Sequence, residues 1–160
     1  MRRARWAFVL PLLLFCSCGF RLQGSTPLPG SLKVSYVDAK DHQSDFVLGL
    51  RDALRGAGAQ LTDRDSDASA VVHVLHDDLA RRVLAVTPTN SPAEIELTYT
   101  VRFSVSVKGA DVLEPQEVSA TRDYSFNETT LLAKDNEEVI LRQALARDLV
   151  SVVMRRLARL

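Results

Sequence analysis

Apolar and polar side chains alternate without a break from Ile95 to Lys108, which is the clearest pattern in the chain. Every odd position is apolar and every even position is polar or charged, as in a strand that is buried on one face only. At about 3.4 Å per residue this strand would reach about 44 Å, well beyond the common length of about five or six residues. We therefore expect it to bend at a bulge or to extend past the body of its domain.

A second strand follows this one in the chain. Gly109 to Asp111 predicts a turn, and Glu117 to Phe126 predicts a returning strand with Val118 and Tyr124 on its apolar face. The two strands are expected to form a hairpin.

Three further β-rich stretches precede the alternating strand. Leu32 to Val37 suits a short first strand. Val71 to Asp77 and Val83 to Thr87 are either one long strand interrupted by charged residues or two separate segments. Pro88 to Pro92 predicts the turn into the alternating strand.

Helical spacing occurs twice. Ser44 is a plausible N-cap, and Gly58 offers a stop for a helix of about thirteen residues; its apolar positions are Phe46, Leu50, Ala53, Leu54 and Ala57. Asp135 or Asn136 is expected to cap a last helix, with apolar positions at Val139, Ala146, Leu149, Val150, Val153 and Leu157. Its opposite face carries Arg147, Ser151, Arg155 and Arg159, which is either a solvated face or a contact for lipid phosphate or a partner.

The order of these elements predicts an α+β fold, with two α-helices packed on one face of a mixed, mainly antiparallel four-stranded β-sheet. A strand-helix-strand order with short links implies parallel pairing of the flanking strands. The other sheet face is expected to be a docking surface or an ordinary hydrated face; it would present Thr98, Thr100, Ser104, Ser106, Ser119, Thr121 and Ser125.

The N-terminus is typical of a signal peptide. Arg2, Arg3 and Arg5 precede an apolar run from Trp6 to Phe15, which is about ten residues against the roughly 20 that a spanning helix needs. The sequence that follows resembles a bacterial lipobox, in which small residues precede an obligatory cysteine.

Cys18 fits as the lipidated residue because small Ser17 precedes it, whereas bulky Phe15 precedes Cys16. Several acyl chains, palmitate among them, would hold the protein stably on a membrane. We expect residues 1–17 to be a lipoprotein signal peptide, 18–30 a lipidated tether and 31–160 a single α/β domain. Gly19 after the cysteine favours sorting to the outer membrane.

Composition narrows the function classes. Of 160 residues, 46% are apolar and 25% charged, which is a globular balance. Equal numbers of basic and acidic residues argue against a nucleic-acid partner.

Catalytic and metal chemistry have little support. His73 and His76 are three apart on a predicted strand, so they are expected on opposite faces. Asp77 and Asp78 also diverge, and no catalytic or phosphate-binding motif occurs. We expect no catalytic residue, metal or cofactor, and a periplasmic hydrolase would have no residues to use.

Three stretches resemble the LPS-assembly lipoprotein (LptE) family: Cys18 to Leu22, the alternating strand entered through Ala93 and Glu94, and Leu132 to Glu137 before the last helix. The resemblance implies a lipid-anchored protein on the periplasmic side of the outer membrane. It would sit inside a large β-barrel LPS-assembly protein (LptD-like), as plug and assembly aid, and would bind lipopolysaccharide without covalent chemistry.

The resemblance also suggests binding residues. Lys134 matches the family's basic residue in the Ala-Lys-Asp-Asn-Glu motif, a proposed lipopolysaccharide contact. The turn at 88–92 lacks the basic residue that the family uses there, so Arg81 and Arg82 are candidates to replace it. The alternative function is a lipid-anchored adaptor or binding module of another envelope complex.

Overall fold

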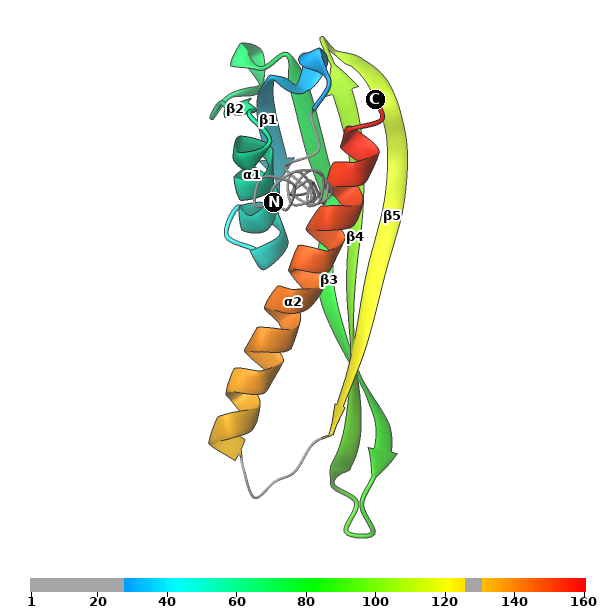
Figure 1. The fold of residues 1–160 in the computed structure, drawn as a ribbon. Coiled ribbons are helices and arrows are strands. Elements are labelled where there is room, and N and C mark those ends of the chain that lie inside the picture. Colours follow the sequence, from blue (N-terminus) through cyan, green and yellow to red (C-terminus); the bar gives the residue numbers. More distant parts are fainter. Residues whose placement is uncertain (1–27, 126–130) are drawn as a thin grey trace, which may run out of the picture.

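The computed structural model describes residues 28–125 and 131–160, with side chains described for all of these except 131–136. Within them, one five-stranded sheet has the order β2-β1-β3-β4-β5, and two helices pack on it (Figure 1). The strands are β1 (Val34–Ala39), β2 (Gln60–Leu61), β3 (Ala70–Val86), β4 (Pro92–Val107) and β5 (Ala110–Ser125).

The α+β class and the mixed sheet are confirmed, but the expected number of four strands is wrong. β1 pairs in parallel with both β2 and β3, whereas β3, β4 and β5 pair antiparallel. The additional strand is β2, which follows the first helix directly. With two residues it is too short to produce a pattern of alternation.

The alternating strand is β4, and its predicted register is confirmed. Its apolar side chains between Ile95 and Val105 are at most 3% exposed. Both expectations for its length are also met. β4 is irregular opposite β5 near Phe103 and Val105, and it runs on past β1, which reaches only Val74 of its neighbour β3.

Helix α1 (Asp45–Gly56) begins as the sequence predicts. The Ser44 Oγ accepts a hydrogen bond from the Val47 N–H at 3.1 Å, and Gly58 follows the helix with φ +88°. The buried residues of α1 are Phe46, Val47, Leu50 and Leu54.

Helix α2 (Leu131–Leu157) begins earlier than expected, so Asp135 and Asn136 are not its caps. Leucine, alanine and lysine favour helix, which accounts for the extension upstream. The predicted apolar stripe is buried from Ala146 to Leu157, and Leu145 joins it. Val139 is instead 41% exposed, because the first half of α2 runs beyond the part of the sheet that α1 and β1 widen (Figure 1). No helix in the described ranges has the length and apolar character needed to cross a bilayer.

β3 is one continuous strand, which resolves the two alternatives that its sequence allowed. Its register with β4 shifts at Leu75, where one residue is inserted. His73 pairs with Ser104 and His76 pairs with Arg102, two positions apart on β4, so both histidines face the same side of the sheet. The expectation of opposite faces is wrong because the bulge reverses the alternation.

The bulge also turns Asp77 toward the helices. Its carboxylate accepts hydrogen bonds from the Ser44 Oγ and from the Tyr99 phenol. Burial, followed by the neighbouring Asp77 carboxylate, raises the pKa of Tyr99 well above its ordinary value. Ser44 therefore links the start of α1 to β3 and, through Asp77, to β4.

Replacing this linking serine should destabilise the fold. Ser44→Ala removes the helix cap and one partner of Asp77, so we expect the free energy of unfolding to fall by about 1–2 kcal/mol. Ser151→Ala, at an exposed position on α2, should cost less than about 0.5 kcal/mol. Urea unfolding of the two variants checks this, and equal costs would show that the cap does not stabilise the fold.

Candidate ligand-binding end of the sheet

Three strands continue beyond β1, and only the first half of α2 accompanies them (Figure 1). We call this part the distal end and define it as 76–86 of β3, 92–102 of β4 and 117–125 of β5. It closes in a turn where the Thr87 N–H donates to the Ser91 carbonyl at 2.7 Å. Asn90 adopts φ +63° there, a conformation that asparagine tolerates better than most residues.

The two candidate arginines of the distal end lie on opposite faces of the sheet. Arg81 pairs with Leu97 of β4 and faces α2, where its guanidinium lies 3.8 Å from the Glu138 carboxylate. Arg82 faces the open side, where its guanidinium lies 2.8 Å from the Glu96 carboxylate. The structure therefore does not bring Arg81 and Arg82 into one site.

The other two candidates from the sequence are only partly covered by the structure. Position 134 lies in the first turn of α2, four residues before Glu138 and thus on the same side of the helix. The Lys134 side chain lies outside the described residues, as does the whole of Cys18.

Glu138 joins the start of α2 to two strands. Besides the contact to Arg81 on β3, its Oε2 accepts a hydrogen bond from the Tyr124 hydroxyl on β5 at 2.8 Å. Burial, and then the Glu138 carboxylate, raises the pKa of Tyr124 to about 12. The sequence does not indicate this contact, because nothing in it distinguishes Glu138 from any other acidic residue near a helix start.

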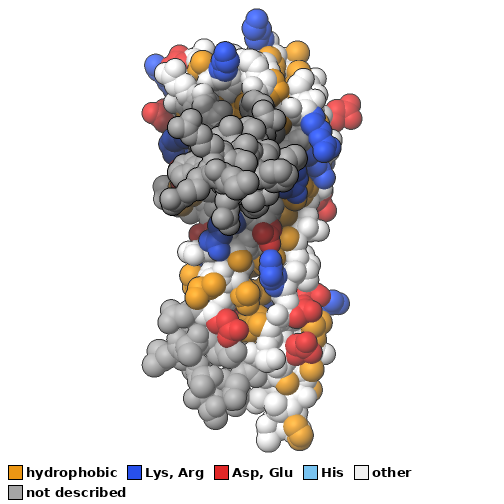
Figure 2. Space-filling view, viewed as in Figure 1, with side chains coloured by type: hydrophobic (Ala, Val, Ile, Leu, Met, Phe, Trp, Pro, Cys, Tyr) orange, Lys and Arg blue, Asp and Glu red, His pale blue; other side chains and the backbone are white. Residues whose placement is uncertain are grey.

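Aliphatic side chains are exposed next to these charges. Val83 is 47% exposed, Leu84 40% and Val86 56%, directly after the arginine pair on β3. Figure 2 shows hydrophobic side chains at the surface of the lower half of the molecule, between charges of both signs. The distal end thus combines cations with accessible apolar surface.

The face of the sheet away from the helices carries short hydroxyl side chains, as predicted. Thr98 and Thr121 face each other across β4 and β5 with their Oγ1 atoms 3.2 Å apart. Ser104 and Ser106 are exceptions, since they are only 8% and 9% exposed. Ser106 lies under the His73 ring, which contacts its Oγ at 3.1 Å.

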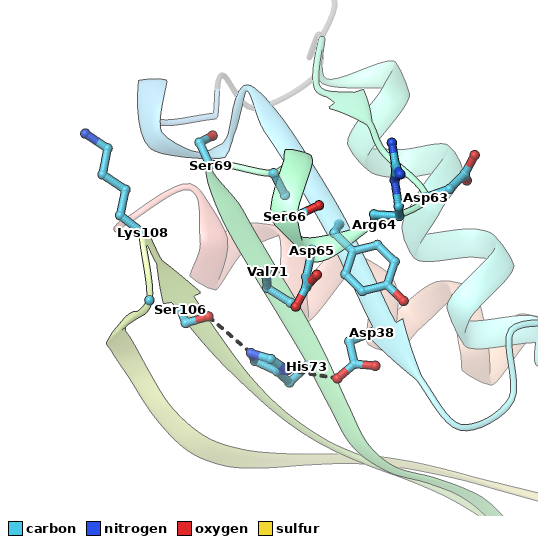
Figure 3. Close-up of a pocket in the computed structure, with 13 residues that line it drawn as sticks. Asp38, Asp63, Arg64, Asp65, Ser66, Ser69, Val71, His73, Ser106 and Lys108 are labelled. Carbon is cyan, nitrogen blue, oxygen red and sulfur yellow. Dashed lines mark hydrogen bonds and ion pairs between the residues drawn. The ribbon is translucent and has the colours of Figure 1, made fainter.

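His73 is one of the residues that line a hollow of about 730 Å³ at the other end of the sheet (Figure 3). The His73 Nδ1 lies 3.0 Å from the Asp38 carboxylate and its Nε2 lies 3.1 Å from the Ser106 Oγ. Carboxylate, imidazole and hydroxyl thus follow one another in the order of a catalytic triad. A triad also needs an accessible nucleophile and an oxyanion hole.

Ser106 does not meet those needs, because it is largely buried on a strand that pairs on both sides. Asp38, His73 and Ser106 instead connect β1, β3 and β4 through side-chain contacts. Among the described side chains, no group of three or more His, Cys, Asp or Glu residues is arranged to hold a metal ion.

The family model described as LptE, lipopolysaccharide-assembly, matches residues 31–157 of the chain. The LPS-assembly lipoprotein LptE of Pectobacterium atrosepticum is 27% identical over 161 residues, which cover 98% of this chain and 86% of that protein.

Solved structures show the same fold. A minor lipoprotein from Acinetobacter baumannii superposes with a TM-score of 0.67 and 26% identity, over 83% of this chain and 94% of that one. The solution structure of lipoprotein B from Nitrosomonas europaea has a TM-score of 0.71 over 88% of this chain and 90% of that one; at 23% identity it supports the fold alone.

The Tyr124–Glu138 contact should make stability depend on pH in the alkaline range. The folded-state pKa of Tyr124, about 12, lies above the ordinary value near 10. Its stabilising contribution is therefore complete below about pH 10 and is lost as the pH rises through about 12. Between about pH 9 and 11, the wild type should lose about 1 kcal/mol more unfolding free energy than Tyr124→Phe.

Urea unfolding across that range measures the difference. Tyr36→Phe, which leaves the Glu138 contact intact, should follow the wild-type curve. Parallel curves for wild type and Tyr124→Phe would contradict the assignment.

Proposed function

The chain belongs to the LptE family of lipopolysaccharide assembly, and from that premise we propose its specific role. We propose an outer-membrane lipoprotein, anchored on the periplasmic side through Cys18, that plugs a large β-barrel lipopolysaccharide translocon and assists its assembly. It binds lipopolysaccharide during delivery to the cell surface and performs no covalent chemistry. Residues 1–17 act as signal peptide, 18–30 as lipidated tether and 31–160 as the folded domain.

The open polar face of the sheet is the observation that carries the proposal of a plug. Large membrane barrels have a polar interior and an apolar outer band. A body that fills such an interior needs a polar surface, on which opposite charges can pair as Arg82 and Glu96 do on this face. Short hydroxyl side chains on β4 and β5, such as Thr98 and Thr121, meet this need at a small cost in side-chain entropy.

The distal end supports binding of lipopolysaccharide, which carries phosphates next to acyl chains. Arg81 and Arg82 are 46% and 70% exposed and pair with carboxylates, and exposed ion pairs of this kind contribute little to stability. Their guanidinium groups can therefore exchange a carboxylate for a phosphate at low cost. Arg81 shares the α2 side with helix position 134, and Arg82 supplies a contact on the open face.

Reversing the charge at Lys134 should weaken lipopolysaccharide binding. A charge-assisted hydrogen bond contributes about 1.5 kcal/mol or more, so Lys134→Glu should raise the Kd at low salt about tenfold. Lys108→Glu, which reverses a charge in the β4–β5 turn at the opposite end, is the matched control. Titration with lipopolysaccharide at low and high salt checks this. Equal affinities of the two variants would remove Lys134 from the site.

Removing the lipidated cysteine should release the protein from the membrane. Cys18→Ala deletes the only attachment point that we propose, since one or more acyl chains on that residue supply the membrane affinity. Fractionation of cells should find this variant outside the membrane pellet, whereas Cys16→Ala should remain membrane-bound. A Cys18→Ala protein that still pellets with the outer membrane would contradict lipid anchoring at this residue.

A further inference from the structure

The outer face of α2 carries arginines that lack a carboxylate partner. Arg147, Arg155 and Arg159 are exposed, and no carboxylate of the described residues lies within ion-pair distance of them. Most other described arginines do have such a partner: Arg51, Arg55, Arg64, Arg81, Arg82, Arg122 and Arg142. The three unpaired arginines and Ser151 among them form what we call the arginine row. It spans about 12 Å along the helix from Arg147 to Arg155, and Arg159 lies just beyond the helix end.

Acidic residues are nearly absent from this part of α2. Between Val139 and Leu160 the single acidic residue is Asp148, and it is already engaged by Arg122 of β5 at 2.8 Å. The arginine row therefore presents positive charge that no described carboxylate pairs with.

The helix dipole explains only part of the row. Cations in the last turn of a helix are stabilised by the partial negative charge of its C-terminus, and this effect fades within one turn. Arg155 and Arg159 lie near that end, but Arg147 lies about three turns away from the last residue. The helix dipole therefore does not account for Arg147.

The residue types on this face favour a protein partner over a bilayer. The four cations of α2 after Val139 and Arg159 just beyond its end are all arginines, and none is lysine. Protein interfaces are enriched in arginine and methionine and depleted in lysine, because the planar guanidinium binds carboxylates in a bidentate manner. On the same side of the helix Met154 is partly exposed and Ile140 is 61% exposed, which adds the apolar contact that an interface uses.

We propose that the arginine row docks on a carboxylate-bearing protein surface, namely the wall of the β-barrel partner. The identity of that partner rests on the function proposed above. The plug would then contact the barrel through both sides, with hydroxyl groups on the sheet face and arginines on the helix face. The helix contact would be the salt-sensitive one and would fix the orientation of the domain.

A photo-crosslinking residue at position 151 tests this in the full chain, expressed in its native envelope. A benzophenone amino acid in place of Ser151 stands in the middle of the row. We expect an adduct with the barrel, on a peptide that contains aspartate or glutamate.

Reversing the charges of the row should reduce the yield of this adduct about tenfold or more, in a variant that combines Arg147→Glu, Arg155→Glu and Arg159→Glu. The corresponding glutamine variants should give an intermediate yield of the adduct. They replace the triple charge reversal in the test if that variant does not fold. Arg55→Glu on α1 should leave the yield unchanged.

The outcomes separate this inference from the proposed function. In the first case, the barrel co-purifies with the tagged wild type, but position 151 links only to phospholipid or links to the barrel whether or not the arginines are present. This result overturns the docking inference and leaves the proposed function standing. If no barrel is recovered and position 151 links, in an arginine-dependent way, to an acidic peptide of another envelope protein, the proposed function fails and the docking role of the row stands. No protein adduct and no barrel would overturn both.

Discussion

The register of β4 is the constraint on which the rest of the structure depends. This strand lies between β3 and β5, and its odd-numbered side chains from Ile95 to Val105 are almost completely buried under the helices. A slip by one residue would place this entire apolar set in water. Because both helices lie on one face, the opposite face keeps its hydroxyl side chains for water or a partner. A domain with one internal core and one polar outer face follows from this arrangement.

The unequal lengths of the strands separate the distal end from the body of the domain. β1 accompanies β3 only as far as Val74, and the bulge at Leu75 begins the part of the sheet that extends beyond it. There the core thins, aliphatic side chains become accessible, and Glu138 connects α2 to Arg81 and Tyr124. Several side chains of the distal end are thus less buried than those of the body of the domain.

Much of the fold could be predicted from the sequence, because local patterns encode it. The alternation after Ile95 and the cap at Ser44 were sufficient to place β4 and α1. The bulge at Leu75 has no local signature, so the common orientation of His73 and His76 could not be predicted. The same holds for the site: adjacent arginines on β3 could be named, but their pairing with carboxylates depends on tertiary contacts. The roles of Lys134 and Cys18 stay predictions.

The proteins that co-purify with this lipoprotein from the membrane test the central claim most directly. The tagged full chain is extracted from its native envelope in mild detergent, and the stoichiometry of the proteins that leave with it is measured. A lipoprotein that plugs a translocon should emerge in a one-to-one complex with a large outer-membrane β-barrel. Recovery of the lipoprotein alone, or only with soluble envelope proteins, would contradict the claim that its polar sheet face serves to fill a barrel.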